Sequence, residues 1–393
     1  MSKWEWKKIS TLVTKCQNIK WDNVPLDDSR LYIDLSSVNK DTQCIEDVSE
    51  VNVENAPSRA KQIIHENDVL FATTRPTQKR VCIVERQYDN QICSTGFCVL
   101  RPLDCLESKY LFYCLLSDDF YSYIKPLEKG ANYPAVTDGD VKNYEIPVPP
   151  LSEQKSIVKF LDEEFSKIET LKTNAETNLK NAKELFETTL EKELNPLSRH
   201  SERSEESSAD LPSGWEWVAL NNVCKKIFAG GDKPQNCSKK SNEILSVPVY
   251  ANAIENEGLY GYTGKAVVKE PCLTISARGT IGFTVKRTEP FVPIIRLIVL
   301  IPKIDVIDLD YFFFSVKHLK IVGNGTSIPQ LTVPLVKQYT IPLPPLSVQK
   351  EIVARLDKLS ENVKRLEANY KQIIADCDEL KKSILKKTFE GES

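Results

Sequence analysis

Two long stretches of this chain carry apolar residues at helical spacing, and each follows a pair of prolines. Their apolar positions alternate in steps of four and three, which is the pattern of a coiled-coil seam. The first stretch is interrupted only at Lys172, and the second runs for more than four heptads without a gap. The predicted seam residues are Leu161, Phe165, Ile168, Ala175, Leu179, Ala182 and Phe186, then Ile352, Leu356, Leu359, Val363, Leu366, Tyr370, Ile373, Cys377, Leu380 and Ile384.

These stretches predict two long helices, at 151–194 and 346–393, that pair with each other. Each helix is expected to begin at a serine N-cap, Ser152 or Ser347. About 40 residues at about 1.5 Å each span on the order of 60 Å, and a solitary helix of that length would expose its apolar stripe to water. Because the first helix leads to the second half of the chain and the second helix starts there, an antiparallel coiled coil is predicted.

An internal repeat frames both halves of the chain. Residues 146–158 recur 195 residues later as 341–353, both reading Ile-Pro-x-Pro-Pro-Leu-Ser-x-Gln-Lys, and the Trp-Glu-Trp at 4–6 recurs at 215–217. The interiors between these shared ends differ. This pattern predicts pseudo-two-fold symmetry and a common frame that carries variable recognition loops. The alternative is a duplicated domain that has diverged without such a role.

The segments inside the frames mix short strand-like runs with helical patterns. Strands are expected at 69–72, 81–84, 273–276 and 297–301, and helices at 109–123 and 309–319. The chain is therefore assigned to the α+β class, with two mixed α/β domains at 1–150 and 214–345 joined by the long helices. The polar stretch 195–213 is interpreted as a flexible linker, with a partner-binding tail as the alternative.

Charge, cysteine content and hydropathy limit which kinds of site and which location are expected for this protein. The net charge is -3, but residues 214–345 carry 15 basic and 10 acidic side chains against 18 and 22 in 1–150. Phosphate affinity in the first half therefore has to come from a local patch or a partner. Eleven scattered cysteines and three histidines predict reduced core thiols and no metal site. Without a long apolar run or a secretory signal, a cytoplasmic protein with no membrane contact is expected.

Two polar loops occur at equivalent places in both halves and are candidate DNA contacts. One follows a predicted strand and carries arginine, whose donor fork suits guanine or phosphate. The other lies in the repeat upstream of the prolines and carries amides and an aromatic ring, which suit adenine edges and base stacking. The alternative is that both loops are merely solvated surface. The predicted contacts are Arg75, Lys79, Arg80, Asn132 and Tyr133 in the first half, and Arg278, Thr280, Ser327 and Gln330 in the second.

Catalytic motifs are missing from the sequence. It has no Asn/Asp-Pro-Pro-Tyr/Phe motif of an amino-methyltransferase, no phosphate-binding P-loop, no Gly-x-Ser-x-Gly elbow and no His-Glu-x-x-His pair. We therefore expect no catalytic centre and no cofactor of its own. Acidic residues are plentiful, so a self-contained metal nuclease stays open as an alternative.

The doubled proline motif, the Gly-Trp-Glu-Trp start at 214–217 and the segments 93–97 and 228–234 resemble the specificity subunit of type I restriction-modification systems. The resemblance covers essentially the whole chain. Within it, Lys233 joins the candidate DNA contacts, while Asp232 stands where the family usually has threonine and the linker is longer than the frame requires.

The resemblance implies a non-catalytic subunit of a host-defence complex. Each target-recognition domain would read one half of a split double-stranded DNA target, and the helices would set the spacer. The implied partners are two adenine methyltransferase subunits, which would hold S-adenosylmethionine, and a translocating restriction subunit. The main rival is a coiled-coil scaffold that joins proteins without reading DNA.

Overall fold

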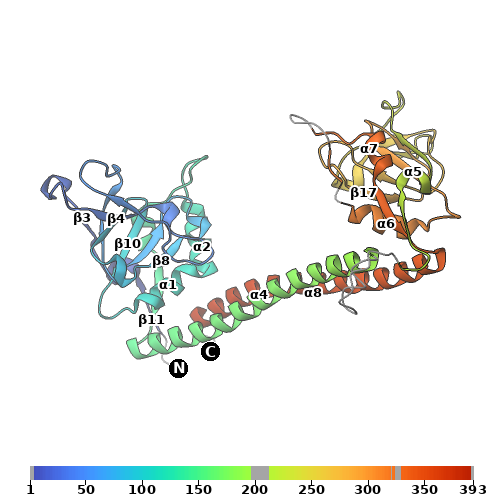
Figure 1. Cartoon of the computed structure of the whole chain (residues 1–393). Coiled ribbons are helices and arrows are strands. Elements are labelled where there is room, and N and C mark those ends of the chain that lie inside the picture. Colours follow the sequence, from blue (N-terminus) through green and yellow to red (C-terminus); the bar gives the residue numbers. More distant parts are fainter. Residues whose placement is uncertain (1–3, 196–211, 320, 324–328, 391–393) are drawn as a thin grey trace. The chain divides into compact units, whose positions relative to one another are not determined.

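The computed structural model describes residues 4–195, 212–319, 321–323 and 329–390. It divides into two compact units, Met1–Glu176 with Lys371–Ser393 and Thr177–Tyr370. Each unit contains one globular module, the beginning of one long helix and the end of the other (Figure 1). We call the globular parts module 1 (4–150) and module 2 (212–345).

The long helices are α4, Leu151–Leu194, and α8, Leu346–Glu390. At their starts, the Gln154 amide donates to the Pro150 carbonyl and the Gln349 amide donates to the Pro345 carbonyl, both at 3.0 Å. Each helix therefore begins directly after its prolines. The serine N-caps predicted at 152 and 347 are wrong, because both serines already lie inside the first helical turn.

A two-stranded ribbon closes each module. In module 1, β1 (Glu5–Lys8) pairs antiparallel with β11 (Glu145–Val148), so that Trp6 lies opposite Pro147. In module 2, β12 (Glu216–Ala219) pairs in the same way with β20 (Thr340–Leu343), and Trp217 lies opposite Pro342. The two repeated sequence segments of each module are thus its first and last strands.

The same four-stranded sheet occurs in both modules. Its order is β2-β10-β7-β8 in module 1 and β13-β19-β16-β17 in module 2, and all neighbours are antiparallel. The first set spans Val13–Thr14, Phe97–Pro102, Val69–Ala72 and Val81–Ile83. The second set spans Cys224–Ala229, Ile298–Pro302, Cys272–Ile275 and Thr284–Arg287.

The remaining elements differ between the modules. Module 1 adds a five-stranded sheet, β3-β6-β9-β4-β5, and module 2 adds a three-stranded sheet, β15-β14-β18. The former spans Gln17–Asn18, Ala60–Ile64, Gln91–Ser94, Arg30–Ile33 and Ser49–Val51. The latter spans Leu259–Thr263, Val247–Tyr250 and Val292–Pro293. The α+β class with two mixed modules and two long helices is confirmed.

The short helices flank the shared sheets. They are α1 (Ser108–Leu116), α2 (Asp118–Ile124) and α3 (Asp138–Lys142) in module 1, with α5 (Leu220–Val223), α6 (Leu309–His318) and α7 (Val333–Gln338) in module 2. The single helix expected at 109–123 is divided at Ser117, whose side chain accepts the Phe120 amide and caps α2. Among the described residues, no helix is long and apolar enough to cross a membrane.

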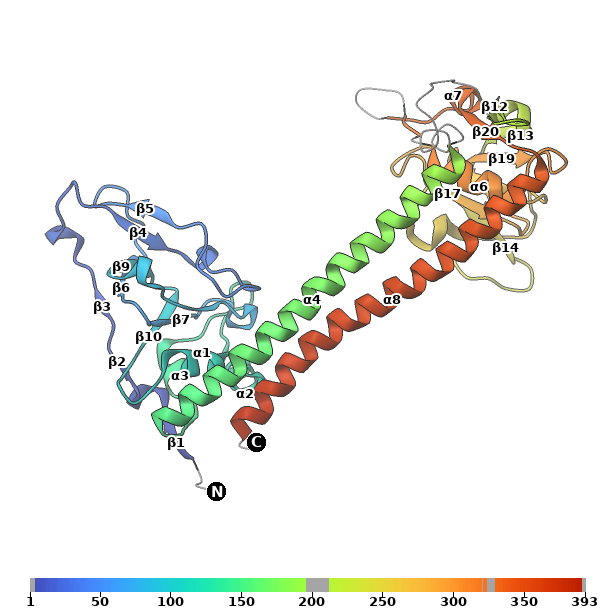
Figure 2. The ribbon, with the colours of Figure 1, turned by 60° about the horizontal axis from the view of Figure 1, so that its bottom comes forward.

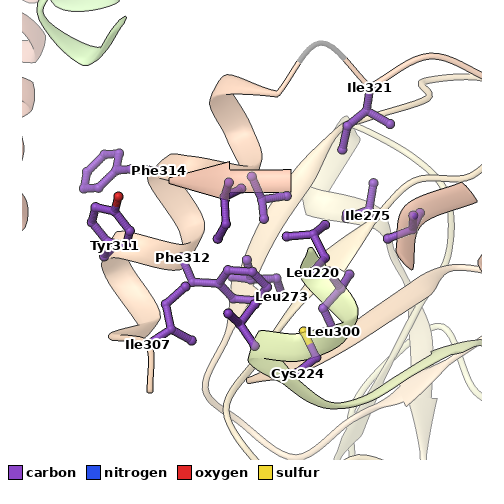
Figure 3. Close-up of a cluster of buried hydrophobic side chains, with 14 of the residues drawn as sticks. Leu220, Cys224, Leu273, Ile275, Leu300, Ile307, Tyr311, Phe312, Phe314 and Ile321 are labelled. Carbon is purple, nitrogen blue, oxygen red and sulfur yellow. The ribbon is translucent and has the colours of Figure 1, made fainter. Parts of the chain in front are cut away.

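The far end of each long helix completes the core of a module. Leu385 and Phe389 near the end of α8 are buried in the core of module 1, where the Phe389 ring lies 5.5 Å from that of Tyr110. Leu190 and Leu194 at the end of α4 occupy the same repeat positions and are buried in the core of module 2. Figure 3 shows part of that second core, where residues from α5, β16, β19 and α6 converge.

A buried glutamine joins each long helix to its module. The Gln154 side-chain oxygen accepts the Glu107 amide at 2.8 Å, and its nitrogen donates to the carbonyls of Cys105 (3.0 Å) and Pro149 (2.9 Å). Gln349 makes the equivalent three bonds, to the Asp308 amide and the carbonyls of Val306 and Pro344. Both glutamines are fully buried, so this motif residue serves the same structural role twice.

Ion pairs between α4 and α8 show the direction and register of the helix pair. In unit 1, Lys172 contacts Asp378 at 2.8 Å and Glu169 contacts Lys381 at 2.7 Å. Numbering rises along α4 as it falls along α8, so the predicted antiparallel pairing is confirmed there (Figure 2). Lys172, which interrupts the predicted seam, is partly exposed, and its ammonium contacts the Asp378 carboxylate on α8.

The predicted seam is only half buried. On α4, Leu161, Ile168, Ala175 and Ala182 are buried at intervals of seven residues. On α8, however, Leu366, Ile373 and Leu380 stay 37%, 40% and 48% exposed. The alternation therefore describes two faces of α8, one packed inside the described chain and one open to solvent.

Replacing the buried glutamine by leucine should destabilise a module. Gln154→Leu leaves one amide and two carbonyls without their partner, and a single unsatisfied buried polar group costs about 1–3 kcal/mol. We expect a lower denaturation midpoint for Gln154→Leu and for Gln349→Leu. Gln87→Leu, at an exposed position, is the matched control, and equal stability of all three variants would contradict the role of the motif.

Residues 1–195 alone should form a homodimer, because α4 would otherwise expose its apolar stripe. The repeat position that corresponds to Asp378 is Lys183, so two identical helices would place Lys172 opposite Lys183. Such like charges weaken a pair. We expect a weak dimer that Lys183→Asp strengthens at low salt, as measured by sedimentation equilibrium.

Lys180→Asp provides the control for this experiment, since it makes the same change of charge one turn away. If both variants dimerise equally, the fragment does not pair in the register of the full chain.

Candidate nucleic-acid interface

In module 1, the two loops that were predicted to contact DNA lie side by side. The turn after β7 and the loop at 130–134 are joined by hydrogen bonds from the Arg75 amide to the Pro134 carbonyl (2.7 Å) and from the Val136 amide to the Thr73 carbonyl (2.9 Å). These hydrogen bonds pair residues 73–75 with residues 134–136 just beyond the end of β7. Two loops that are distant in sequence therefore form one surface.

Arg75 and Tyr133 form the exposed tip of this surface. The guanidinium carbon of Arg75 lies 4.9 Å from the centre of the Tyr133 ring, and the ring itself is 70% exposed. Arg75 also donates to the backbone carbonyl of Asn132 at 3.5 Å. This hydrogen bond does not involve the Asn132 side chain, which was the predicted DNA contact. The cation–π stack orients the guanidinium while leaving its other N–H groups accessible.

The backbone around Arg75 has an uncommon conformation. Arg75 and Lys79 have φ values of 51° and 57° and flank the short turn Pro76–Gln78. Left-handed backbone at residues other than glycine costs free energy and is concentrated at functional sites. Arg75, which stacks on Tyr133, is one of these residues.

Lys79 and Arg80 are placed differently from Arg75. The Lys79 ammonium pairs with Asp118 at 3.2 Å and lies 4.5 Å from the centre of the Tyr121 ring, which ties it to α2. The half-buried Arg80 guanidinium donates to the backbone carbonyls of Leu35 and Val38. Arg80 therefore binds a neighbouring loop of its own module.

Module 2 brings together the corresponding pair of loops. The Leu331 amide donates to the Ala277 carbonyl at 2.9 Å, so the turn after β16 lies beside the segment that carries Gln330. The Gln330 side-chain oxygen accepts from the Arg278 guanidinium at 2.8 Å. The predicted arginine and the predicted amide thus form one exposed group, as in module 1 but with glutamine in place of tyrosine.

The other predicted residues of module 2 have separate positions. The Thr280 hydroxyl oxygen is buried and has no hydrogen-bond partner among the described residues. The Lys233 ammonium is exposed and lies 5.3 Å from the centre of the Tyr260 ring, which Lys239 approaches to 4.0 Å. Ser327 lies outside the described residues.

Sequence reasoning missed Asn252, which organises the module 2 surface. Its side-chain oxygen accepts the Ala277 amide at 2.9 Å, and its nitrogen donates to the Ile295 carbonyl at 2.6 Å. Only its place after the strand β14 could have drawn attention to it. Lys239 was also missed, although it lies in the basic run at 239–240.

Two further arginines are internal and differ from Arg75 and Arg278. Arg101 binds the buried carboxylate of Asp68 through two nitrogens, and these hydrogen bonds raise its pKa. Arg287 is 3% exposed and stacks on Tyr250 at 3.6 Å, and burial lowers its pKa. Neither is free to meet an external anion.

Metal binding and thiol reactivity depend on the histidine, cysteine and acidic side chains of the described residues. Within the described ranges, no group of three or more histidine, cysteine or acidic side chains could hold a metal ion. All eleven cysteines are free thiols, and burial raises the pKa of Cys224 and Cys272 to about 12. Seven of the eleven are buried, as expected for core cysteines.

Comparison with protein families gives a match over most of the chain. The model described as "Type I restriction modification DNA specificity domain" matches residues 1–181 and 212–375. A putative type I specificity subunit of Mycoplasma pneumoniae is 35% identical over 144 residues, which cover 37% of this chain and 43% of that protein. Another from the same organism is matched over 54% of its length, so the chain spans about half of these two relatives.

Longer matches extend over nearly the whole chain. A putative type I restriction enzyme specificity subunit of Methanocaldococcus jannaschii is 25% identical over 88% of this chain and 82% of its own. The crystal structure of the HsdS subunit from Thermoanaerobacter tengcongensis is similar with a TM-score of 0.68 and 28% identity, over 100% of this chain and 98% of that one. A chain solved in work on complex assembly and conformational transition of the type I R-M system gives a TM-score of 0.85 and 27% identity, over 99% and 98%.

Removing the exposed arginines tests the interface directly. Arg278→Ala should weaken DNA binding through module 2 by about 1–3 kcal/mol if the guanidinium is bidentate to a base, and Arg75→Ala should act likewise through module 1. Arg80→Ala is a control for arginine loss, because Arg80 already binds backbone carbonyls. Competition binding with each half of the target would measure the effects, and full affinity in both alanine variants would show that these tips are solvated surface.

Proposed function

Because the chain belongs to the type I restriction-modification DNA specificity family, we propose that it selects the DNA sequence on which a type I complex acts. The observation that supports this proposal most is the recurrence of one exposed arginine tip at the same place in two modules with different interiors. Arg75 with Tyr133 and Arg278 with Gln330 each combine a charged fork with a polar or aromatic neighbour. Such a pair can contact a base edge and the adjacent backbone.

Each module would read one half of a split double-stranded target. The tips differ chemically, so the two half-sites should differ in sequence. Phosphate contacts would supply the remaining affinity, and module 2, with its basic balance, would contribute more of it. The long helices would then set the unread spacer between the half-sites.

The chain would act without catalysis of its own. Adenine methylation and its S-adenosylmethionine would belong to two methyltransferase subunits, and DNA translocation and cleavage to a restriction subunit. The exposed apolar positions of α8, Leu366, Ile373 and Leu380, fit a docking surface for methyltransferase helices, since they repeat every seven residues on one face.

Reconstitution separates this function from its rivals. The purified chain with DNA, magnesium and S-adenosylmethionine should neither cleave nor methylate, whereas addition of the methyltransferase should give adenine methylation at a split site. Methylation mapped by sequencing would identify both half-sites. Turnover by the chain alone would support a self-contained enzyme, and assembly without sequence-selective, salt-sensitive binding would support a scaffold.

The same assay tests the proposed docking surface on α8. Ile373→Glu with Leu380→Glu should abolish association with the methyltransferase while the modules stay folded. Glu163→Gln with Lys167→Gln, on an exposed part of α4, should leave association intact.

Lengthening both helices tests the spacer. Seven residues inserted after Ala175 and seven in the facing part of α8 add about 10 Å, close to three base pairs at about 3.4 Å each. We expect unchanged half-sites separated by a longer spacer, read from the methylated motif. An unchanged spacer in an intact complex would show that the helices do not determine it.

A further inference from the structure

A second turn lies beside Arg278 at the same end of the module 2 sheet. Strand β16 ends at Ile275 and leads to Arg278, while β19 begins at Ile298 and is preceded by Ile295 and Arg296. Ile275 and Ile298 are paired partners in antiparallel strands. The turn before β19 and the turn after β16 therefore emerge next to each other.

This second turn presents an apolar and a basic side chain in a strained conformation. Ile295 and Arg296 have φ values of 51° and 61°, which is costly for any residue other than glycine and most of all for a β-branched one. Ile295 is nevertheless 51% exposed, and Arg296 is exposed as well. An isoleucine that gains no burial from a strained backbone indicates a role outside the folding of the module.

Hydrogen bonds hold this turn in place and connect it to the Arg278 turn. The amides of Ile295 and Arg296 donate to the carbonyls of Gly231 (2.9 Å) and Gly230 (3.2 Å). Asn252 bridges the two turns, because it accepts the Ala277 amide and donates to the Ile295 carbonyl. A side chain at Gly230 would place its Cβ 2.6 Å from the Pro293 backbone, so only glycine permits this close approach.

Module 1 has no counterpart of this turn. The residues before its equivalent strand β10, 94–96, all have ordinary φ values, and Thr95 donates its amide to the Arg59 carbonyl. The feature therefore belongs to module 2 and its half-site alone.

On the basis of the proposed function, we infer that the Ile295–Arg296 turn is a second DNA-reading element of module 2. The 5-methyl group of thymine is the apolar group that the major groove offers to a protein, and Ile295 is an exposed apolar residue on the turn beside the Arg278 tip. Ile295 contacts that methyl group and so contributes selectivity.

Arg296 contacts a phosphate of the same half-site. Arg278 has its guanidinium plane oriented by Gln330, as a bidentate base contact requires, whereas the Arg296 guanidinium has no hydrogen-bonded or acidic partner among the described residues. An unoriented cation is suited to a phosphate, which attracts charge without demanding one fixed geometry.

The test uses the assembled complex with its methyltransferase and DNA that carries both half-sites. Ile295→Ala should lower affinity only when the second half-site is cognate. Arg296→Ala should weaken binding to cognate and altered second half-sites alike and reduce the slope of log affinity against log salt by about one. Ile304→Ala and Lys269→Ala are matched controls, since these exposed residues follow β19 and precede β16 at the opposite end of the sheet.

A DNA substitution supplies a second measurement that leaves the protein unchanged. Replacing thymine by deoxyuridine, one position at a time, removes only the methyl group. One position in the second half-site should weaken wild-type binding roughly fourfold, as expected for one buried methyl-sized group. The Ile295→Ala complex should be insensitive at that position.

The outcomes separate the two levels of inference. A wild-type complex without sequence selectivity would overturn the proposed function as a whole. A selective wild-type complex whose Ile295 and Arg296 variants behave like the controls, or which responds to no deoxyuridine substitution in the second half-site, would overturn the role of this turn alone.

Discussion

A single buried side chain, used twice, is the constraint on which the rest of the architecture depends. Gln154 holds the loop before α1 through the Glu107 amide and the Cys105 carbonyl, and Gln349 holds the loop before α6 through the Asp308 amide and the Val306 carbonyl. Both glutamines lie in the first turn of a long helix. The Pro-Pro pair before each long helix keeps the preceding residues extended, so the helix cannot begin before the second proline. Because Tyr110 and Tyr311 also donate to the carbonyls of Pro147 and Pro342, the exit direction of each helix is fixed against its own module.

This fixed frame allows the interior to vary. In each module the first and last strands pair with each other, which brings the two ends of the module together. The five-stranded sheet of module 1 and the three-stranded sheet of module 2 therefore change neither this ribbon nor the start of the long helix. The shared sheet then presents its post-strand turn at the same corner in both modules. Recognition chemistry can change from tyrosine to glutamine beside the arginine without any change in the scaffold.

The sequence was informative where the signals are local and failed where they are not. The two helices and the frame follow from prolines, heptads and the repeat, but strand order could not be derived because β10 pairs with strands distant in sequence. Arg80 resembled Arg75 in sequence, and only the fold brings the carbonyls of Leu35 and Val38 to it. The turn at Ile295 left no signal, since backbone conformation is not visible in residue types, and the α8 stripe gave no indication of which half would be buried.

The packing of Leu385 and Phe389 into module 1 has a consequence for synthesis. A ribosome makes the rest of module 1, all of α4, all of module 2 and most of α8 before it makes these two side chains. The core of module 1 therefore stays incomplete, with Tyr110 and its neighbours uncovered, until nearly the last turn of α8 has emerged. The first module to be translated is the last to be finished, so a premature stop late in α8 would impair the half of the protein farthest from it in the gene.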